Sequence, residues 1–386
     1  MRVAYYCQHV LGMGHFFRSL EIAKALADHE VDLISGGPEV RAELPPHVSL
    51  FRLPGLMMND DFSELYPLEP GRSLEEVKNE RARLLSERFL LFSPDLFLVE
   101  LFPFGRNQFS FELLPLLQDI RDGHFGPVKV VCSLRDILVE KSNQEKYEAR
   151  VVKRLNEFFN LLAVHADPAL LRLDETFGSL DRVRIPVRYT GFVTTKPRSG
   201  AGIALRRELG LEPSQKLIVA SIGGGKVGGR LLFAALQAFA RLGLSGARMH
   251  VFSGPYMEAS EFLALEKLAS AIPGVILEHF TDRFLDYLDA ADLSLSQAGY
   301  NTAMNILATG VPALVWPFDQ NHEQRLRAEK LKQLGVLGIL EDADLESERL
   351  AVRMAQAMEA GRRSGPAPVD LDGAANTARL LQDLAS

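Results

Sequence analysis

The chain has 386 residues, and its 43 lysines and arginines against 50 aspartates and glutamates give a formal net charge of −7. Its composition of 47% hydrophobic and 24% charged residues excludes collagen-like, disordered and disulfide-scaffold proteins and indicates a soluble globular one. The acidic balance also argues against nucleic acid as a partner, because such binding needs a basic surface. At about 100 to 200 residues per domain, the length predicts two domains.

The cysteines and the apolar runs bear on location. Cys7 and Cys132 lie in apolar runs far apart in the sequence, so we expect reduced core residues, as in a cytoplasmic protein. The first strand-like run begins at Arg2, which leaves no room for a signal peptide, and no stretch reaches the roughly 18 apolar residues of a membrane-spanning helix. We therefore expect a cytoplasmic location, with peripheral contact at the inner face of the membrane as the closest approach to lipid.

Short apolar runs of strand length alternate with longer amphipathic stretches, which predicts an α/β fold built on parallel sheets. A polar segment at 194–200, with proline and glycine, is the predicted linker between two doubly wound, Rossmann-like domains at 1–193 and 201–365, and a C-terminal helix follows within 366–386. Such domains bind ligands at the carboxyl ends of their strands, so the two would face each other across a cleft. The runs read as strands are 3–8, 31–35, 96–101 and 128–133, then 217–222, 249–253, 275–280, 293–296 and 313–317.

The first motif follows the first strand and opens a helix with Gly14, His15 and Arg18. Glycine lets a backbone approach a ligand, and free amides at a helix start attract anions. The motif is not a complete dinucleotide fingerprint, because Phe17 stands in the place of its third glycine. His15 at the positive helix end is expected to have a lowered pKa and to act as a neutral general base, with a capping or packing role as the alternative. Arg18 would share its face of the helix or else lie in solvent.

The second motif is the glycine run Gly223, Gly224 and Gly225 followed by Lys226, at the end of the first strand of the second domain. Successive glycines before a helix make a nest of amides for a phosphate or a sugar oxygen, or else a flexible turn. Val227 stands where a P-loop has serine or threonine, so ATP hydrolysis is not supported.

In the third and most informative motif, a strand ends at Gly299 and a helix begins near Asn301 or Thr302. Gly310 closes this helix. This helix start is another anion site. The later Asp342-Ala343-Asp344 matches a metal-binding pattern literally, but we read it as helix capping and predict no metal.

In this order, the three motifs resemble GT-B glycosyltransferases of the family 28 type, the group of the peptidoglycan-building N-acetylglucosaminyltransferase, and also the related UDP-sugar hydrolases. The resemblance implies a cytoplasmic hexosyltransferase of cell envelope polysaccharide synthesis that uses a nucleotide-sugar, such as a UDP-sugar, and no cofactor. The acceptor would be a glycan, a lipid-linked molecule or a small aglycone. Besides Gly14, Arg18 and the glycine run with Lys226, the donor-binding residues implied are Phe280, Thr281, Gly299, Tyr300, Asn301, Thr302, Asp319, Gln320, Glu323 and Gln324.

Asn305 departs from the family pattern, which places at this point a glutamate that binds both ribose hydroxyls. A carboxamide has one acceptor oxygen and a donor group, so the ribose contact must change, and UDP is not fixed as the carrier.

The implied chemistry is an inverting, metal-independent displacement at the anomeric carbon. His15 would deprotonate the acceptor, and the helix amides would stabilise the leaving diphosphate. Glu100 and Asp136, which follow strands of the first domain, are alternative bases or structural partners of Arg106 or Arg135.

Two other functions stay open at this point. One is a nucleotide-sugar hydrolase, which needs no acceptor. The other is a sugar-nucleotide-binding protein without turnover. Apolar loop residues near 54–62 and 101–106 would suit a lipid-linked or aglycone acceptor, or else pack under the loops.

Overall fold

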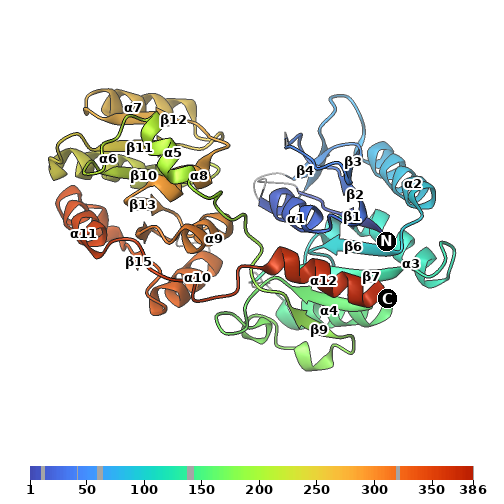
Figure 1. The fold of residues 1–386 in the computed structure, drawn as a ribbon. Helices are drawn as coiled ribbons and strands as arrows, with labels where there is room; N and C mark the ends of the chain where they lie inside the picture. The colour runs from blue at the N-terminus through green and yellow to red at the C-terminus, as the bar shows by residue number, and fades with distance from the viewer. Residues whose placement is uncertain (10–13, 41, 59–63, 137–142, 319–321, 386) are drawn as a thin grey trace. The chain divides into compact units, whose positions relative to one another are not determined.

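The computed structural model describes the chain except residues 10–13, 41, 59–63, 137–142, 319–321 and 386. It divides into two compact units: unit 1 comprises Met1–Val193 with Val369–Ser386, and unit 2 comprises Thr194–Pro368. In each unit, strands and helices alternate along the chain (Figure 1).

Unit 1 is built on a seven-stranded sheet with the order β3-β2-β1-β6-β7-β8-β9. All neighbouring pairs in it are parallel, so the strands end at one common edge. A separate antiparallel hairpin is formed by β4 and β5. The strands are β1 (Arg2–Tyr6), β2 (Glu30–Ser35), β3 (Val48–Arg52), β4 (Leu56–Met58), β5 (Leu65–Pro67), β6 (Leu96–Glu100), β7 (Lys129–Leu134), β8 (Leu161–Val164) and β9 (Val187–Tyr189).

The C-terminal helix belongs to the core of unit 1. Ala378 and Leu381 of that helix are buried in one cluster with Phe16 and Leu20 of the first helix, and the two helices pack together (Figure 1). The C-terminal residues therefore cover the sheet at whose edge the first motif lies. The helices of unit 1 are α1 (Gly14–Ala25), α2 (Leu74–Phe92), α3 (Ser110–Arg121), α4 (Gln144–Phe158) and α12 (Gly373–Ala385), with short 3-10 helices at Asn107–Phe109, Leu173–Glu175 and Leu180–Arg182.

Unit 2 has a six-stranded parallel sheet with the order β12-β11-β10-β13-β14-β15. Its strands are β10 (Leu217–Ser221), β11 (Arg248–Phe252), β12 (Val275–Glu278), β13 (Leu293–Ser296), β14 (Ala313–Val315) and β15 (Gly338–Ile339). Its helices are α5 (Ala201–Glu208), α6 (Gly229–Leu242), α7 (Ala259–Ser270), α8 (Phe284–Ala290), α9 (Tyr300–Thr309), α10 (His322–Gln333) and α11 (Ser347–Ala360), with a 3-10 helix at Asp342–Leu345.

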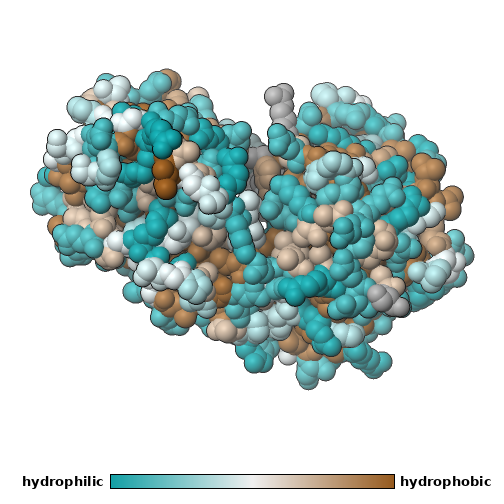
Figure 2. All heavy atoms as spheres, in the orientation of Figure 1, coloured by the Kyte–Doolittle hydropathy of each residue, from teal (hydrophilic) through white to brown (hydrophobic). Residues whose placement is uncertain are grey.

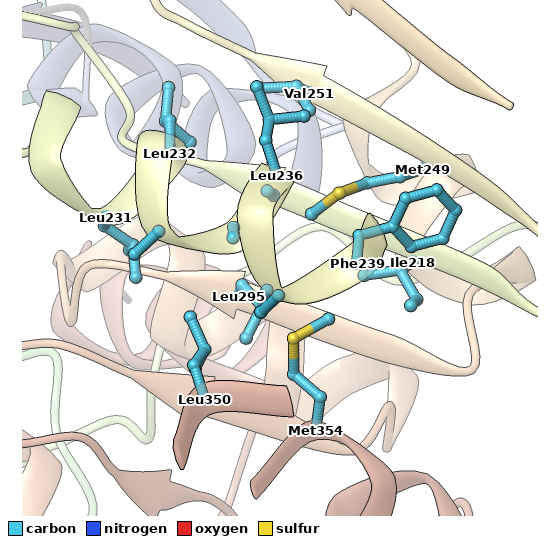
Figure 3. Close-up of a cluster of buried hydrophobic side chains, with 14 of the residues drawn as sticks. Ile218, Leu231, Leu232, Leu236, Phe239, Met249, Val251, Leu295, Leu350 and Met354 are labelled. Carbon is cyan, nitrogen blue, oxygen red and sulfur yellow. The ribbon is translucent and has the colours of Figure 1, made fainter. Parts of the chain in front are cut away.

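The core of unit 2 lies between its sheet, α6 and α11. Figure 3 shows Leu236 and Phe239 of α6 in one buried cluster with Met249 of β11, Leu295 of β13 and Met354 of α11. Burial of these side chains fixes β10 and β13 beside each other, together with the loops that follow them.

Several elements differ from the expected ones. The α9 helix begins at Tyr300 rather than at Asn301 or Thr302, while Gly310 closes it as expected with φ 68°. The prediction that Asp344 caps the helix after it, α11, was wrong. The Asp344 carboxylate instead accepts from the backbone N–H of Glu341, at the start of the 3-10 helix Asp342–Leu345. The α11 helix has no side-chain cap.

Hydrophilic residues cover most of the face drawn in Figure 2, with hydrophobic ones scattered among them, as is usual for globular surfaces. Within the described residues, no helix combines the length and the apolar character needed to cross a bilayer.

Candidate active site

His15 is the second residue of α1, and it lies against the end of β6. Its Nδ1 is 2.6 Å from Oε1 of Glu100, the last residue of that strand, which is fully buried. The two meet because β1 and β6 are parallel neighbours whose carboxyl ends share one edge. A carboxylate only accepts, so Nδ1 of His15 carries the proton and Nε2 is left as the acceptor. The imidazole is 17% exposed, so a substrate can reach it.

The buried guanidinium of Arg18 completes this group. It donates to the same Oε1 of Glu100 and lies 3.3 Å from Nδ1 of His15. One carboxylate thereby holds both side chains that the first motif supplies. Glu100 is engaged by His15 and Arg18 rather than by hydrogen bonds to Arg106 or Arg135, its expected structural partners.

Burial sets the protonation state of His15. It lowers the pKa of His15 to about 4, although the neighbouring Glu100 carboxylate raises it. The sequence interpretation had the direction right, but it gave the helix end as the cause. For Glu100, burial raises the pKa, but His15, Arg18 and Arg106 hold it well below the ordinary value. A neutral imidazole beside an ionised carboxylate is the arrangement of a general base and the group that orients it.

A second buried network, which sequence reasoning missed, lies beside this pair. Arg81 of α2 is fully buried and donates to both oxygens of Glu112 at 2.9 and 2.6 Å. It also donates to Oε1 of Gln8 at 2.8 Å and to the carbonyl oxygen of Pro54 at 2.7 Å. These bonds hold the segments that follow β1 and β3. The available signal was the spacing of Arg81, which falls four residues after the buried Val77 in an apolar helical stripe.

A cavity of about 360 Å³ opens at the same edge of unit 1. Phe16, which follows His15, is part of its lining, and so is His9, whose Nε2 lies 2.8 Å from the carbonyl oxygen of Pro38. Other lining residues are Ser35, Glu39, Val40, Leu50, Arg52, Leu53, Leu68 and Glu69. This mixture of apolar and charged side chains suits a small molecule that carries polar groups. Asp136, the third base considered, is buried just after β7.

In unit 2, two helices begin at one edge of the sheet without a side-chain cap. Gly299 precedes α9 and Gly228 precedes α6, and neither glycine has a side chain that caps its helix. An added Cβ at Gly299 would meet none of the described atoms within 4 Å, whereas one at Gly229 would lie 1.8 Å from a carboxylate oxygen of Glu261, beside the α6 start. Because β10 and β13 are parallel neighbours, both loops lie at the same edge, where helix starts favour an anion.

Gln297 lies between these two helix starts. The residue is 8% exposed, and its Nε2 is buried without a hydrogen-bond partner. A Cβ added at Gly228 would lie 2.6 Å from that Nε2, which places the amide against the α6 start. A buried donor without an acceptor costs free energy unless a ligand satisfies it, so Gln297 belongs to the site. Sequence reasoning missed it. Its position directly after β13, two residues before Gly299, was the signal.

Close packing requires glycine at one position of the glycine run. Gly225 has φ 93°, and a Cβ there would lie 2.5 Å from the carbonyl oxygen of Ser253. At Gly224 the added Cβ would make only an ordinary contact, 3.5 Å from the ring of Tyr256. The loop after β10 thus rests on the loop after β11, while Lys226 is exposed at its end.

Four other expected donor residues lie after β12 and on α10. Phe280 follows β12 and is 54% exposed, and the Thr281 hydroxyl accepts from the backbone N–H of Arg283 at 3.1 Å. Gln324 on α10 accepts from the backbone N–H of Phe318 at 3.2 Å, and Glu323 beside it is buried.

A side chain of α10 contacts the start of α9. Tyr300 is packed under the guanidinium of Arg327, which donates to the carbonyl oxygen of Ala298 at 3.1 Å. Asn301 is exposed, and Thr302 and Asn305 are partly buried along α9. Asp319 and Gln320 lie outside the described residues. Within the described part of the chain, no three His, Cys, Asp or Glu side chains are grouped to hold a metal ion.

Part of the chain is similar to known proteins in sequence. Residues 222–369 match the glycosyltransferase family 28 C-terminal domain. The UDP-N-acetylglucosamine–N-acetylmuramyl-(pentapeptide) pyrophosphoryl-undecaprenol N-acetylglucosamine transferase of Acidothermus cellulolyticus is 30% identical over 168 residues, 43% of this chain and 44% of that protein. Its namesake from Mycolicibacterium smegmatis is 27% identical over 180 residues, 46% of this chain and 45% of that protein. The chain thus spans less than half the length of these relatives.

Solved structures match over the whole chain. The calicheamicin glycosyltransferase CalG4 has a TM-score of 0.60 at 18% identity and covers 100% of this chain and 97% of its own. MurG of Acinetobacter baumannii has a TM-score of 0.56 at 13% identity, over 100% and 99%. At these identities the match concerns the fold, which is GT-B. Residues 222–369 are thus similar to the C-terminal domain of family 28 glycosyltransferases, within a chain whose fold is GT-B.

Proposed function

We propose that the protein transfers a sugar from a nucleoside-diphosphate donor to an acceptor hydroxyl. The observation that carries this proposal is the neutral His15 whose Nδ1 is held by the buried Glu100, because this leaves Nε2 as a base at the edge where α/β domains bind ligands.

The donor diphosphate would bind at the carboxyl edge of unit 2. The amides at the start of α9, the loop before α6 and the Gln297 amide would supply donors to the phosphate oxygens. Lys226, Glu323 and Gln324 would contact the phosphates and the sugar, and the exposed Phe280 with Thr281 would contact the base. The names of the relatives favour a UDP-sugar. Asn305 would make a ribose contact different from that of a glutamate.

The reaction would be a single displacement with inversion. As the acceptor oxygen attacks the anomeric carbon, its proton passes to Nε2 of His15, and the bond from that carbon to the diphosphate oxygen breaks. Glu100 stabilises the imidazolium that forms, and the amides before α9 and α6 stabilise the charge on the leaving diphosphate. Arg18 keeps Glu100 ionised.

The acceptor hydroxyl would be presented from the cavity beside Phe16 and His9, which is large enough for a compact part of an acceptor. The relatives' names speak of a lipid-linked acceptor, pyrophosphoryl-undecaprenol, so we propose a cytoplasmic protein that meets such an acceptor at the inner face of the membrane. A glycan or a small aglycone remains the other class that this cavity would accept.

The first experiment identifies the donor and then tests the roles. Thermal shifts with UDP-, dTDP-, GDP- and CDP-sugars should single out one carrier, and nucleotide release is then measured with and without cell-derived acceptors. His15→Ala should abolish transfer with donor binding nearly unchanged, whereas Gln297→Ala should weaken donor binding about tenfold. If His15→Ala instead abolished donor binding and left transfer intact, the assignment would fail. Release from the donor alone, unchanged by any acceptor, would indicate a hydrolase.

A further inference from the structure

A second hollow in unit 2 lies at the edge of the sheet opposite to the proposed donor site. Its volume is about 600 Å³, and it is lined by residues that precede or begin β14 and β15, such as Gly310 and Gly335. The proposed donor site is formed by residues that follow strands. In a parallel sheet these are opposite edges, so the two places are distinct.

Three arginines line this hollow: Arg353 from α11, and Arg362 and Arg363 from the segment after it. Its other lining residues are apolar or neutral, and within the described chain no aspartate or glutamate is among them. In a chain of net charge −7, such a grouping of positive charge needs an explanation.

The arginines are held mainly by carbonyl oxygens. Arg363 donates to the carbonyl oxygen of Leu307 at 2.6 Å, and Arg353 to that of Ile339 at 3.0 Å. Arg362 donates to the carbonyl oxygens of Asp289 and Ala291, both at 2.8 Å. These bonds fix the guanidinium planes without neutralising them, because a carbonyl carries no net charge.

Compensation of the three charges is incomplete. Arg353 has a carboxylate oxygen of Asp344 at 3.7 Å. Burial lowers the pKa of Arg362, although Asp289 and Asp292 raise it, and burial is the only influence that lowers the pKa of Arg363. The Nε atom of Arg363 is buried without an acceptor. An uncompensated guanidinium next to an open hollow is stabilised when an anion enters.

We propose that this hollow binds a phosphate group, with Arg353 and Arg363 as its main ligands and Arg362 at the rim. Planar guanidiniums match the oxygens of phosphate, and the hollow is larger than one phosphate, so the ligand is a phosphate ester. The ester is either a soluble one or a lipid headgroup. The site does not depend on the proposed sugar transfer.

The test is a titration of the full chain with inorganic phosphate and with glycerol 3-phosphate, followed by thermal shift and calorimetry. Saturable binding is expected, and Arg353→Gln and Arg363→Gln should each weaken it about tenfold. Arg349→Gln is the matched control, because Arg349 lies one turn earlier on α11, is largely exposed, and does not line the hollow. Equal affinities in the parent protein, Arg353→Gln and Arg363→Gln would overturn the proposal.

Two further arms complete the test. If Arg363→Gln does not fold, Arg353→Gln and the charge-retaining Arg363→Lys decide, since only the former should weaken phosphate binding strongly. Sedimentation with vesicles of phosphatidylglycerol against phosphatidylcholine distinguishes the two sources. Arg353-dependent binding to the anionic vesicles supports a lipid headgroup, and binding of glycerol 3-phosphate without vesicle binding supports a soluble ester. The affinity of the same variants for UDP-sugars is measured as a separate test of the proposed donor site.

Discussion

The protonation state of His15 is set by the residues around it more than by the ordinary pKa of an imidazole. A buried imidazole that is joined to an ionised carboxylate experiences two opposite influences, and burial is the stronger of them. The side chain is therefore neutral at the pH values where an ordinary histidine is half protonated.

This leads to a prediction for the pH profile. Transfer should persist well below pH 6.5 and fall only as the pH approaches about 4, where His15 takes up its proton. Arg106→Gln should move this fall to higher pH, because Arg106 lowers the pKa of His15. The measurement is kcat/KM from pH 4 to 8. A fall centred on the ordinary histidine value would contradict the buried pair.

Stability should depend on pH in the same window. The unfolded chain binds a proton at His15 near pH 6.5, whereas the folded chain does so only near pH 4. Between these values the unfolded state holds more protons, so the free energy of unfolding falls as the pH falls.

Glu100 is a positioning residue, and Glu100→Gln tests this role. The variant should lower kcat at least about a hundredfold with KM for the donor nearly unchanged, because a neutral carboxamide does not stabilise the imidazolium that forms and can turn its NH2 group toward Nδ1 of His15. The fall at acid pH should move still lower, since Glu100 raises the pKa of His15. Asp95→Asn is the control, because Asp95 is an exposed carboxylate at the opposite end of β6.

Long-range partners of this kind could not be read from the sequence. His15 and Gly299 were predicted as site residues because Gly14 and Gly299 mark turns before helices. The role of Glu100 was not, because 85 residues separate it from His15 and only the strand order brings them together. Gln297 and Arg81 were missed although each has a positional signal, because a single polar residue after a strand or in a helical stripe does not identify its partners.

At the scale of elements, the loop after β10 should be the most sensitive to small changes. Gly225→Ala places a Cβ on the Ser253 carbonyl oxygen in a left-handed conformation, so it should lower the free energy of unfolding by about 2 kcal/mol and weaken donor binding. Gly224→Ala meets only the Tyr256 ring at an ordinary distance and should change little. Urea unfolding and donor titration of both variants measure this. Equal changes of unfolding free energy and donor affinity in Gly225→Ala and Gly224→Ala would contradict a role for this loop contact.

The long buried strands were predictable because their apolar runs carry their own signal. The edge strands at 48–52 and 187–189 were missed because they are partly exposed, and the strand at 161–164 was missed although its four residues are buried. The hairpin of β4 and β5 was also missed, because three-residue strands give no period. The predicted strand at 275–280 ends at Glu278, where the chain leaves the sheet edge.

At the scale of the whole molecule, α12 ties the end of the chain to unit 1. Leu381→Ala should lower the free energy of unfolding of unit 1 by about 3 kcal/mol, because Leu381 is fully buried in its core. The expected readout is loss of amide protection in β1 and α1 with no change in β10 and α6. The exposed Arg379→Ala, two residues earlier on α12, is the control. Loss of protection confined to unit 2 would contradict this assignment.

That tie has a consequence for biosynthesis. In chain order, unit 2 interrupts unit 1, since 194–368 stand between β9 and α12. A ribosome releases α12 only after residues 194–368, so the sheet of unit 1 has an apolar face uncovered while unit 2 is translated and can already fold. Chaperone dependence should accordingly concentrate on residues 1–193.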